Sequence, residues 1–322
     1  MTLQQIFENN NKIVINSDID GFLSGMLLRK YYNCEIVGFS NSQDKIWLTE
    51  EIDDIYSPVY IDLYVNNPRT TCIEQHVLAY DDVELGIMRT YANKLNPIFE
   101  RGNSTFKKGY YWKYPFGTVH YLLNLMEREG KSIDLPPLGT KKSIPLKNSE
   151  YQICPGQILL RADDAMLNTA KYSDNASQWW EWLNPNKEYA VFNQIAEYLE
   201  QYTDKDDAQK VEDETDDFFI KGLGCDGKDG AFFNIAKANT QDSNNNEELN
   251  PAIYQYIKVI NDLMQTNLFV PKHYICHEGR AIHKDLTSKN DISNYGDSLF
   301  SYAIIWGPNN TKEQLSLTLN ME

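Results

Sequence analysis

Residues 12–30, KIVINSDIDGFLSGMLLRK, decide the predicted fold of this chain. The stretch opens with a short apolar run rich in β-branched residues, which predicts a buried strand. From Phe22 to Tyr32 the apolar residues recur at helical spacing, which predicts a helix. Asp18 and Asp20 then fall in the turn between the two, at the carboxyl end of a strand, where open α/β sheets bind their ligands.

The chemistry of this aspartate pair leaves two interpretations open. Carboxylates this close repel each other unless a cation lies between them or one of them is protonated. Hard divalent cations such as Mg²⁺ and Mn²⁺ favour such oxygen ligands, and Gly21 allows a tight turn beside them. Taken alone, however, Asp-x-Asp-Gly is more typical of an Asx-type turn that caps the following helix.

Residues 12–90 alternate between strand-like and helix-like segments. The strands expected after the first one cover residues 35–39, 58–62 and 70–74. This alternation is typical of βαβ units and predicts an α/β fold, with a mostly parallel sheet flanked by helices. The expected strand ends carry Asp18, Asp20, Asp62, Glu74 and His76. If the strands are neighbours, these side chains converge on one edge of the sheet.

Three further segments of the first 203 residues bear on the fold or the site. A helix is expected over residues 118–128. Residues 158–167 are expected to be helical or turn-like and contain Asp163 and Asp164. The tryptophan-rich segment 179–182 indicates core or interface packing more strongly than nucleobase stacking.

The acidic segment 204–217 is predicted to be a solvated linker between two domains. We expect an α/β domain over residues 1–203 and a smaller α+β, substrate-binding domain over residues 218–322. Within the second domain the expected elements are a glycine-rich turn at 222–230, a strand at 231–235, a helix at 251–266 and a hairpin of 300–306 with 314–319.

Composition limits the environment and the partners of the chain. The 322 residues carry a net charge of −16, and no apolar run approaches the length of a membrane span. The five cysteines are scattered without a Cys-x-x-Cys motif and no signal peptide is visible, so we expect a cytoplasmic protein without disulfides or membrane contact. The absence of a basic stripe argues against long duplex DNA and favours a short polyanionic substrate.

The order and spacing of the acidic motifs resemble the DHH phosphoesterase superfamily, over about the first 200 residues. That family includes single-strand-specific exonucleases, nano-RNases, cyclic-dinucleotide phosphodiesterases and a class of pyrophosphatase. Its first motif, Asp-x-Asp-Gly with a serine shortly after, is similar to Asp18–Gly21 with Ser24. Its second motif, a lone aspartate that ends a strand, is similar to Asp62.

The later motifs match less closely. The Asp-His-His triplet that names the family is here Glu74-Gln75-His76. The fourth motif, an aspartate commonly preceded by alanine, is similar to Ala162-Asp163, with Asp164 as the competing assignment. The glycine-rich, histidine-containing loop that the family usually carries in its smaller domain is not clearly present.

The resemblance implies a metal-dependent phosphoesterase that hydrolyses phosphodiester bonds in short single-stranded oligonucleotides or small nucleotides. It implies one or two Mn²⁺ or Mg²⁺ ions as cofactors. His76 would contact the phosphate or the leaving group. The implied metal ligands are Asp18, Asp20, Asp62 and Asp163.

Two departures from the family motivate an alternative function. Gln75 replaces a histidine ligand, and an amide oxygen is a weaker donor than imidazole for a transition metal. Asn16 stands where exonuclease-like members often have another acid. The alternative is a catalytically attenuated nucleotide-binding protein or an assembly subunit, as a homodimer or within a larger complex.

Two weaker hypotheses complete the prediction. His273, Cys276, His277 and His283 contain a local His-x-x-Cys-His pattern that could contribute zinc ligands, although stray histidines and cysteines in a core are more common. Arg161 is near enough to Asp163 in sequence to contact a phosphate, but a surface ion pair is the more usual role for such a residue.

Overall fold

The computed structural model describes residues 1–146, 149–163, 173–224, 236–241, 246–306 and 313–321. Its strands are β1 Lys12–Asn16, β2 Glu35–Ser40, β3 Lys45–Leu48, β4 Val59–Ile61, β5 Cys72–Ile73, β6 Lys94–Leu95, β7 Lys142–Leu146, β8 Ser149–Ile153, β9 Ala236–Gln241, β10 Asn246–Leu249, β11 His273–Glu278, β12 Arg280–Asp285, β13 Leu299–Trp306 and β14 Glu313–Leu319. Its helices are α1 Leu3–Asn9, α2 Ile19–Tyr32, α3 Asp82–Met88, α4 Pro97–Arg101, α5 Thr118–Arg128, α6 Pro155–Arg161, α8 Asp174–Leu183, α9 Ala190–Leu199, α10 Lys205–Asp217, α11 Pro251–Met264 and α12 Asn290–Ser293. Short helical turns are η1 Phe106–Lys108, η2 Tyr110–Trp112, η3 Pro185–Lys187, η4 Phe218–Leu223 and η5 Gly296–Ser298.

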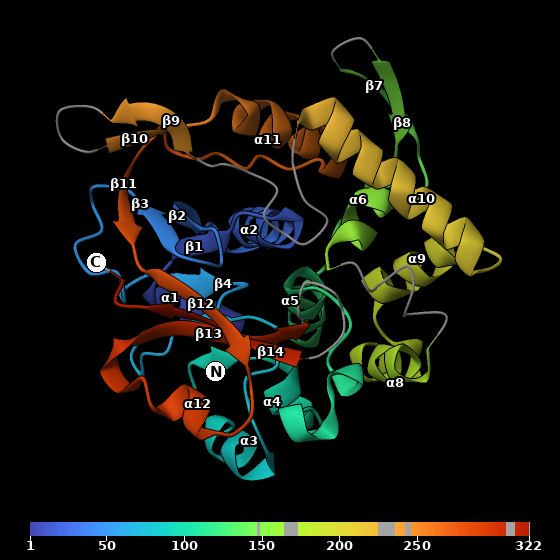
Figure 1. Ribbon diagram of the computed structural model, residues 1–322. Helices are drawn as coiled ribbons and strands as arrows, with labels where there is room; N and C mark the ends of the chain where they lie inside the picture. The colour runs from blue at the N-terminus through green and yellow to red at the C-terminus, as the bar shows by residue number, and fades with distance from the viewer. Residues whose placement is uncertain (147–148, 164–172, 225–235, 242–245, 307–312, 322) are drawn as a thin grey trace.

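The described strands form a nine-stranded sheet, a three-stranded sheet and a two-stranded hairpin (Figure 1). The large sheet has the strand order β6-β5-β4-β1-β2-β3-β11-β10-β9. Strands β6, β5, β4, β1 and β2 are parallel neighbours. From β2 onward the sheet continues through antiparallel pairings with β3, β11, β10 and β9. The predicted α/β class is therefore confirmed as a mixed α/β fold.

The parallel strands are aligned so that their carboxyl ends lie at one level. Ile15 of β1 is paired with Ile61 of β4, and Ile61 is paired with Ile73 of β5. The residues that follow these partners are Asn16, Asp62 and Glu74. The strand register alone therefore places these three polar residues side by side at the carboxyl edge of the sheet.

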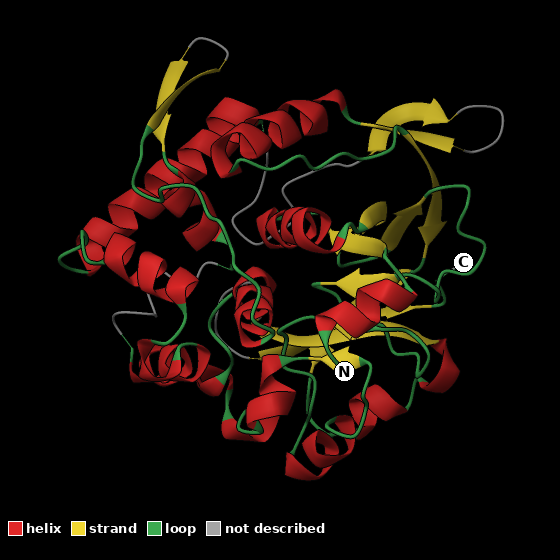
Figure 2. Ribbon diagram, turned by 180° about the vertical axis from the view of Figure 1, so that it is seen from behind, coloured by secondary structure: helices red, strands yellow, loops and turns green. Residues whose placement is uncertain are grey.

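One face of the parallel strands is covered by α2, which is buried from Ile19 to Leu28. The Phe22 ring stacks on Phe39 of β2 at 5.7 Å and meets the edge of Tyr256 of α11 at 5.1 Å. Helix α2 therefore lies between the sheet and α11 (Figures 1 and 2). A helix buried on all sides needs apolar or small residues around its whole circumference, as α2 has.

The opposite face packs on the three-stranded sheet, whose order is β12-β14-β13. The rings of Tyr60 in β4 and Phe300 in β13 meet edge to face at 6.3 Å. Isolated bridges from Val65 to Ser301 and from Val77 to Ile304 join this sheet to the first part of the chain. The predicted hairpin near the end of the chain is confirmed as β13 and β14, which pair antiparallel.

The segment predicted as an acidic linker forms helix α10, which Asp204 caps by accepting a hydrogen bond from Asp207 N. Strand β11, beyond this helix, pairs with β3, which precedes it. The division into domains at 1–203, 204–217 and 218–322 remains a prediction. Trp179 is fully buried, so its role is packing. Most of the predicted turn at 222–230 and the strand at 231–235 lie outside the described residues.

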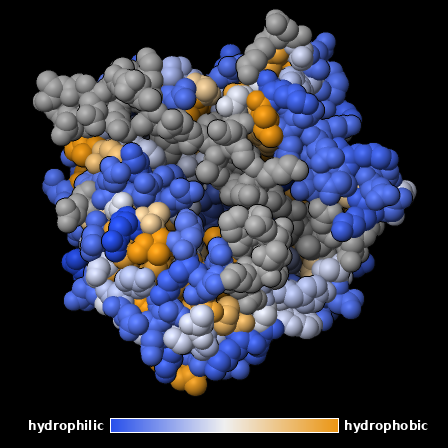
Figure 3. Space-filling view, in the orientation of Figure 1, coloured by the Kyte–Doolittle hydropathy of each residue, from blue (hydrophilic) through white to orange (hydrophobic). Residues whose placement is uncertain are grey.

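The described residues on the face seen in Figure 3 are mostly hydrophilic, with hydrophobic residues scattered among them. Among the described residues, no helix has both the length and the apolar character needed to span a bilayer.

Candidate functional site

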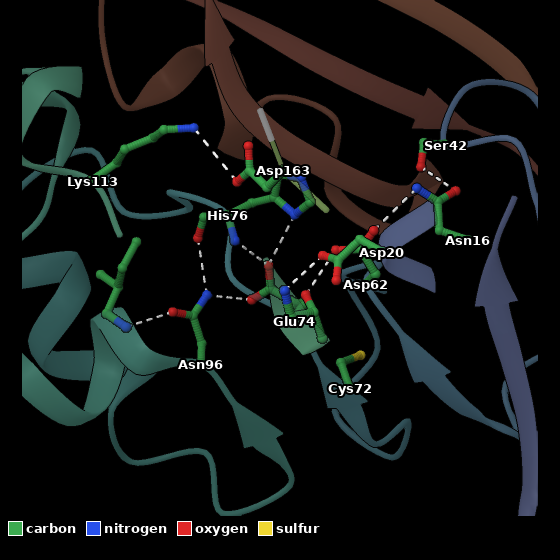
Figure 4. Close-up of polar contacts among 12 residues, drawn as sticks. Asn16, Asp20, Ser42, Asp62, Cys72, Glu74, His76, Asn96, Lys113 and Asp163 are labelled. Carbon is green, nitrogen blue, oxygen red and sulfur yellow. Dashed lines mark hydrogen bonds and ion pairs between the residues drawn. The ribbon is translucent and has the colours of Figure 1, made fainter. Parts of the chain in front are cut away.

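The structure brings together the five side chains that the sequence singled out, four from the carboxyl ends of β1, β4 and β5 and one from the end of α6. Figure 4 labels all of them except Asp18. They interact electrostatically with one another across the site. They are Asp18, Asp20, Asp62, His76 and Asp163. We call them, with Glu74, the carboxylate site. The parallel strands, the start of α2 and the end of α6 supply these residues.

Asp18 is held by the start of α2 and by Asn16. One carboxylate oxygen accepts a hydrogen bond from Gly21 N at 2.8 Å, so Asp18 is the N-cap of α2 and the predicted capping turn is present. The other accepts a hydrogen bond from Asn16 Nδ2. Asn16 Nδ2 also donates to Asp62 Oδ2 at 3.3 Å, and its Oδ1 accepts from Ser42 Oγ at 2.6 Å. The Asn16 amide therefore links two carboxylates in a fixed orientation.

Asp20 belongs to α2, but its carboxylate is bound by the start of α5. Thr118 N donates to Asp20 Oδ2 at 2.6 Å, and Val119 N donates to Oδ1 at 2.8 Å. The positive end of the α5 dipole favours a carboxylate there. Gly117 makes the approach possible, because a Cβ atom at this position would lie 2.7 Å from Asp20 Oδ1.

Two of the aspartates have a left-handed backbone, with φ of 62° for Asp62 and 50° for Asp163. Few non-glycine residues adopt this region, although aspartate does so more often than most, and such conformations gather at functional sites. Thr118 Oγ1 donates to Asp62 Oδ1 at 2.8 Å. Within the described residues Asp163 Oδ2 is buried without a hydrogen-bond donor at ordinary distance, and Lys113 Nζ lies 3.8 Å from it.

His76 is oriented by Glu74, which is almost fully buried. Glu74 Oε2 accepts a hydrogen bond from His76 N at 2.7 Å and lies 3.3 Å from His76 Nδ1. Asn96 Nδ2 donates to Glu74 Oε1 and, at 2.9 Å, to the His76 carbonyl. The strand end after β5 is thereby fixed to the residue that caps α4.

Burial and mutual repulsion disfavour the ionised form of three of the carboxyl groups and raise their pKa values. Burial, with a contribution from the charge of Asp20, raises the pKa of Asp18 to about 7. Burial, with the charge of Asp18, raises the pKa of Asp62 to about 8. Burial and the charge of Asp62 raise the pKa of Asp20 well above its ordinary value. A bound cation would lower these pKa values and favour the ionised carboxylates.

His76 is the positive group already present. Burial lowers its pKa, but its hydrogen bond with Glu74 and the charges of Asp62, Glu74 and Asp163 outweigh that effect and raise the pKa to about 9. At neutral pH the imidazole is therefore protonated. A protonated histidine has two N–H donors, and one of them is engaged by Glu74.

The described residues do not gather every sequence candidate. Gln75 is buried next to His76 in the chain, and Asp164 lies outside the described residues. Arg161 makes no surface ion pair; its Nε lies 2.6 Å from Asp216 Oδ1, and both side chains are buried. The predicted surface ion pair of Arg161 is therefore wrong, because helices α6 and α10 pack together and enclose the Arg161–Asp216 pair.

The zinc candidates are spread over two sheets. His273, Cys276 and His277 lie on β11 of the large sheet, and His283 lies on β12 of the small one. Cys276 and His277 are adjacent in a strand and point to opposite faces. Within the described ranges, no three histidine, cysteine, aspartate or glutamate side chains form a ready-made metal-binding group, either here or at the carboxylate site.

Comparison with known proteins adds no family assignment. No protein-family model, no curated protein sequence and no solved structure matches the chain. The function must therefore be argued from the residues of the site.

Three supporting residues of the site received no role from the sequence alone, although Asn96-Pro97 and Gly117-Thr118 are similar to segments of the exonuclease-like members. Thr118 binds two of the aspartates, Asn96 holds Glu74, and Lys113 approaches Asp163. The available signals were local: Asn96 precedes a proline at a helix start, and Thr118 follows Gly117 at another. Neither signal identifies which carboxylate the residue would bind.

Proposed function

We propose that this chain is a metal-dependent phosphoesterase of the DHH type, which hydrolyses phosphodiester bonds in short oligonucleotides or small nucleotides. The observation that carries the proposal is the convergence of Asp18, Asp20, Asp62 and Asp163 with a protonated His76. Asp18, Asp20 and Asp62 are buried carboxyl groups with raised pKa values beside a cationic imidazole, a combination typical of catalytic sites.

The donor set fits a hard divalent cation. All four proposed ligands are carboxylates, and oxygen ligands suit Mg²⁺ and Mn²⁺. A carboxylate oxygen that accepts one hydrogen bond keeps a second lone pair, so the contacts from Asn16 and Thr118 still leave acceptor capacity. The proposal requires the carboxylates to draw closer on binding or water to complete the coordination, because no ready-made group is present among the described residues.

Each residue of the site would have a distinct role in the proposed hydrolysis. A bound cation would polarise the phosphoryl group and lower the pKa of a water molecule. His76, protonated at neutral pH, would donate a hydrogen bond to a phosphoryl oxygen or a proton to the leaving oxygen. Glu74 keeps the imidazole charged and oriented. Thr118 and Asn16 hold Asp62 in place.

The substrate size follows from charge. A net charge of −16 repels a long polyanion, whereas a short oligonucleotide or a nucleotide would meet mainly the local cations of the site. Lys113 and His76 are the cationic side chains that approach the carboxylates in the contacts described above.

The experiment compares Asp62→Asn with Asp53→Asn, an exposed aspartate outside the site. Purified protein is incubated with Mn²⁺ or Mg²⁺ and with dinucleotides, short oligonucleotides and cyclic dinucleotides. We expect metal-dependent cleavage by wild type and Asp53→Asn, reduced by about 10²–10³-fold in Asp62→Asn. Equal rates in the two variants, or no cleavage of any substrate by wild type, would contradict the proposal.

A second candidate is an attenuated nucleotide-binding or assembly subunit, favoured by Gln75 in place of a histidine ligand. Such a protein would bind nucleotides without turnover. Calorimetry separates the two candidates, because a binding protein of this kind keeps its nucleotide affinity when metal is removed by chelation. A phosphoesterase that needs the cation loses that affinity.

A further inference from the structure

The stretch from the N-cap of α4 to the start of α5 begins and ends at the carboxylate site. Asn96, which caps α4, binds Glu74, and Thr118, the first residue of α5, binds Asp20 and Asp62. The middle of the segment, residues 106–113, reads FKKGYYWK. Four of its eight residues are aromatic and three are lysine, in a protein whose overall charge is strongly negative.

The backbone of this segment is anchored at both sides of the aromatic run. Phe106 N donates to the Ala79 carbonyl at 2.9 Å, just beyond His76 in the chain. At the other side Ser104 Oγ donates to the Trp112 carbonyl, and Asn175 Nδ2 donates to the Lys113 carbonyl at 2.9 Å. The aromatic side chains are therefore presented from a fixed backbone, which reduces the ordering cost of binding a ligand.

Two of these aromatic side chains face solvent. Tyr111 is 56% exposed and Trp112 is 41% exposed, and their ring centroids lie 5.3 Å apart. Among the exposed large hydrophobic side chains of the described residues, they are the only aromatic pair adjacent in sequence. The other aromatic residues of the run are less exposed: Phe106 stacks on Tyr80.

Lys113 connects this exposed pair to the carboxylate site. Its Nζ lies 3.8 Å from Asp163 Oδ2 and 4.8 Å from the centre of the Tyr110 ring. Figure 4 shows the lysine side chain extending toward Asp163. Trp112 precedes Lys113, and consecutive Cα atoms are only about 3.8 Å apart, so the exposed pair ends at the residue whose side chain reaches the site.

Because the two ring planes are 85° apart, one base can stack on only one of them. We propose that Trp112 forms a stacking surface for one nucleobase of the substrate, with Tyr111 at the edge of that base, while the phosphate attached to that nucleoside lies at the carboxylate site beside Lys113. This inference rests on the proposed function and assigns its substrate class to base-bearing phosphodiesters and nucleotides. Aromatic faces stack on any base, and lysines beside them attract the phosphate. Lys107 and Lys108, on the same segment, are each paired with an aspartate, Asp81 and Asp82, so the phosphate contact is assigned to Lys113 alone.

The test separates base recognition from phosphate recognition. Binding of thymidine 5′-monophosphate and of deoxyribose 5-phosphate is measured by calorimetry with Mn²⁺ and full-length protein, where no diester is present to be cleaved. The variants are Trp112→Ala, Trp112→Phe and Phe269→Ala, the last an exposed aromatic outside the segment. We expect Trp112→Ala to weaken the preference for the base-bearing ligand by on the order of tenfold. Trp112→Phe should restore most of it, and Phe269→Ala should match wild type.

An unchanged preference in Trp112→Ala, or a wild-type protein that binds both ligands equally, would overturn the stacking surface. The same variants are then assayed on a thymidine dinucleotide and its base-free counterpart. Cleavage that is indifferent to the bases would leave the phosphoesterase proposal standing and remove the stacking surface. Base-dependent binding without cleavage by any variant would support the stacking surface and contradict the phosphoesterase proposal.

Discussion

The two halves of the large sheet both carry side chains that can bind metals, and only one half gathers them. In the parallel half, Asp18, Asp62 and His76 come from residues separated by long stretches of chain and meet at one edge. In the antiparallel half, His273 and His277 are four residues apart on a single strand. At about 3.3 Å per residue that separation is roughly 13 Å, too far for one ion.

The difference lies in topology and not in composition. Parallel strands send all their carboxyl ends to the same edge, so a polar residue after each strand adds to one site. An antiparallel strand spreads its side chains along its length and over both faces. The first half therefore builds a site from residues that are far apart in sequence, and the second half separates residues that are near neighbours.

The largest expected effect contrasts the histidine at the parallel-strand edge with a zinc candidate on the three-stranded sheet. His76→Ala removes the cation that faces the aspartates, and we expect cleavage of a dinucleotide to fall by about 10²–10⁴-fold. His283→Ala, an exposed histidine on β12, should retain wild-type rates. The measurement is kcat with Mn²⁺ at pH 7.5. A larger loss of kcat in His283→Ala than in His76→Ala would place the active site at the zinc candidates and contradict the contrast drawn above.

A smaller effect is expected from the glycine that lets α5 approach Asp20. Gly117→Ala places a methyl group 2.7 Å from Asp20 Oδ1, so the carboxylate must move. We expect the Mn²⁺ affinity to fall by about 10- to 100-fold, as for other residues that orient metal ligands. Calorimetric titration with Mn²⁺ measures the change.

The control for this substitution is Gly86→Ala in α3. A Cβ atom at Gly86 meets nothing within 4 Å, and an alanine inside a helix is favoured over glycine by about 0.5–1 kcal/mol. Gly86→Ala should therefore keep full Mn²⁺ affinity and gain slightly in thermal stability. Equal Mn²⁺ affinities for the two variants would show that Asp20 does not contribute to binding the ion.

Local sequence patterns predicted much of the fold correctly. The β-branched run before Asp18, the helical spacing after Gly21 and the strand-like runs of the last hairpin all describe patterns within a few residues, so one sequence suffices to detect them. The strand-end rule then placed Asp62 and His76 beside Asp18, because a run of parallel strands has one possible carboxyl edge.

What could not be predicted depends on contacts between distant segments. Nothing near β11 in the sequence indicates that it pairs with β3 and extends the N-terminal sheet. The burial of Arg161 with Asp216 depends on how α6 packs on α10, and the role of Thr118 depends on where α5 begins relative to Asp20. The periodicity of apolar residues along the chain does not indicate which distant segments come into contact.

The last prediction concerns the stability of the metal-free protein. In the folded state the pKa is about 7 for Asp18, about 8 for Asp62 and about 9 for His76, each above the ordinary value of 3.8 for aspartate or 6.5 for histidine. The folded protein therefore binds more protons than the unfolded chain, and the stabilisation from these groups is lost as the pH rises through their folded pKa values. Between pH 6 and pH 9 we expect the free energy of unfolding to fall by more than about 1 kcal/mol, measured by urea denaturation in the presence of a chelator.

Asp62→Asn sharpens this prediction because it removes one of the carboxyl groups that must ionise in the buried site. Its unfolding free energy should fall less steeply with pH than that of wild type, whereas Asp53→Asn, at an exposed position, should follow the wild-type slope. Saturating Mn²⁺ should flatten the wild-type profile as well, because a bound cation favours the ionised carboxylates. A pH profile that is the same in wild type and Asp62→Asn would mean that the excess negative charge is not located at the parallel-strand edge, and the contrast between the two halves of the sheet would lose its electrostatic basis.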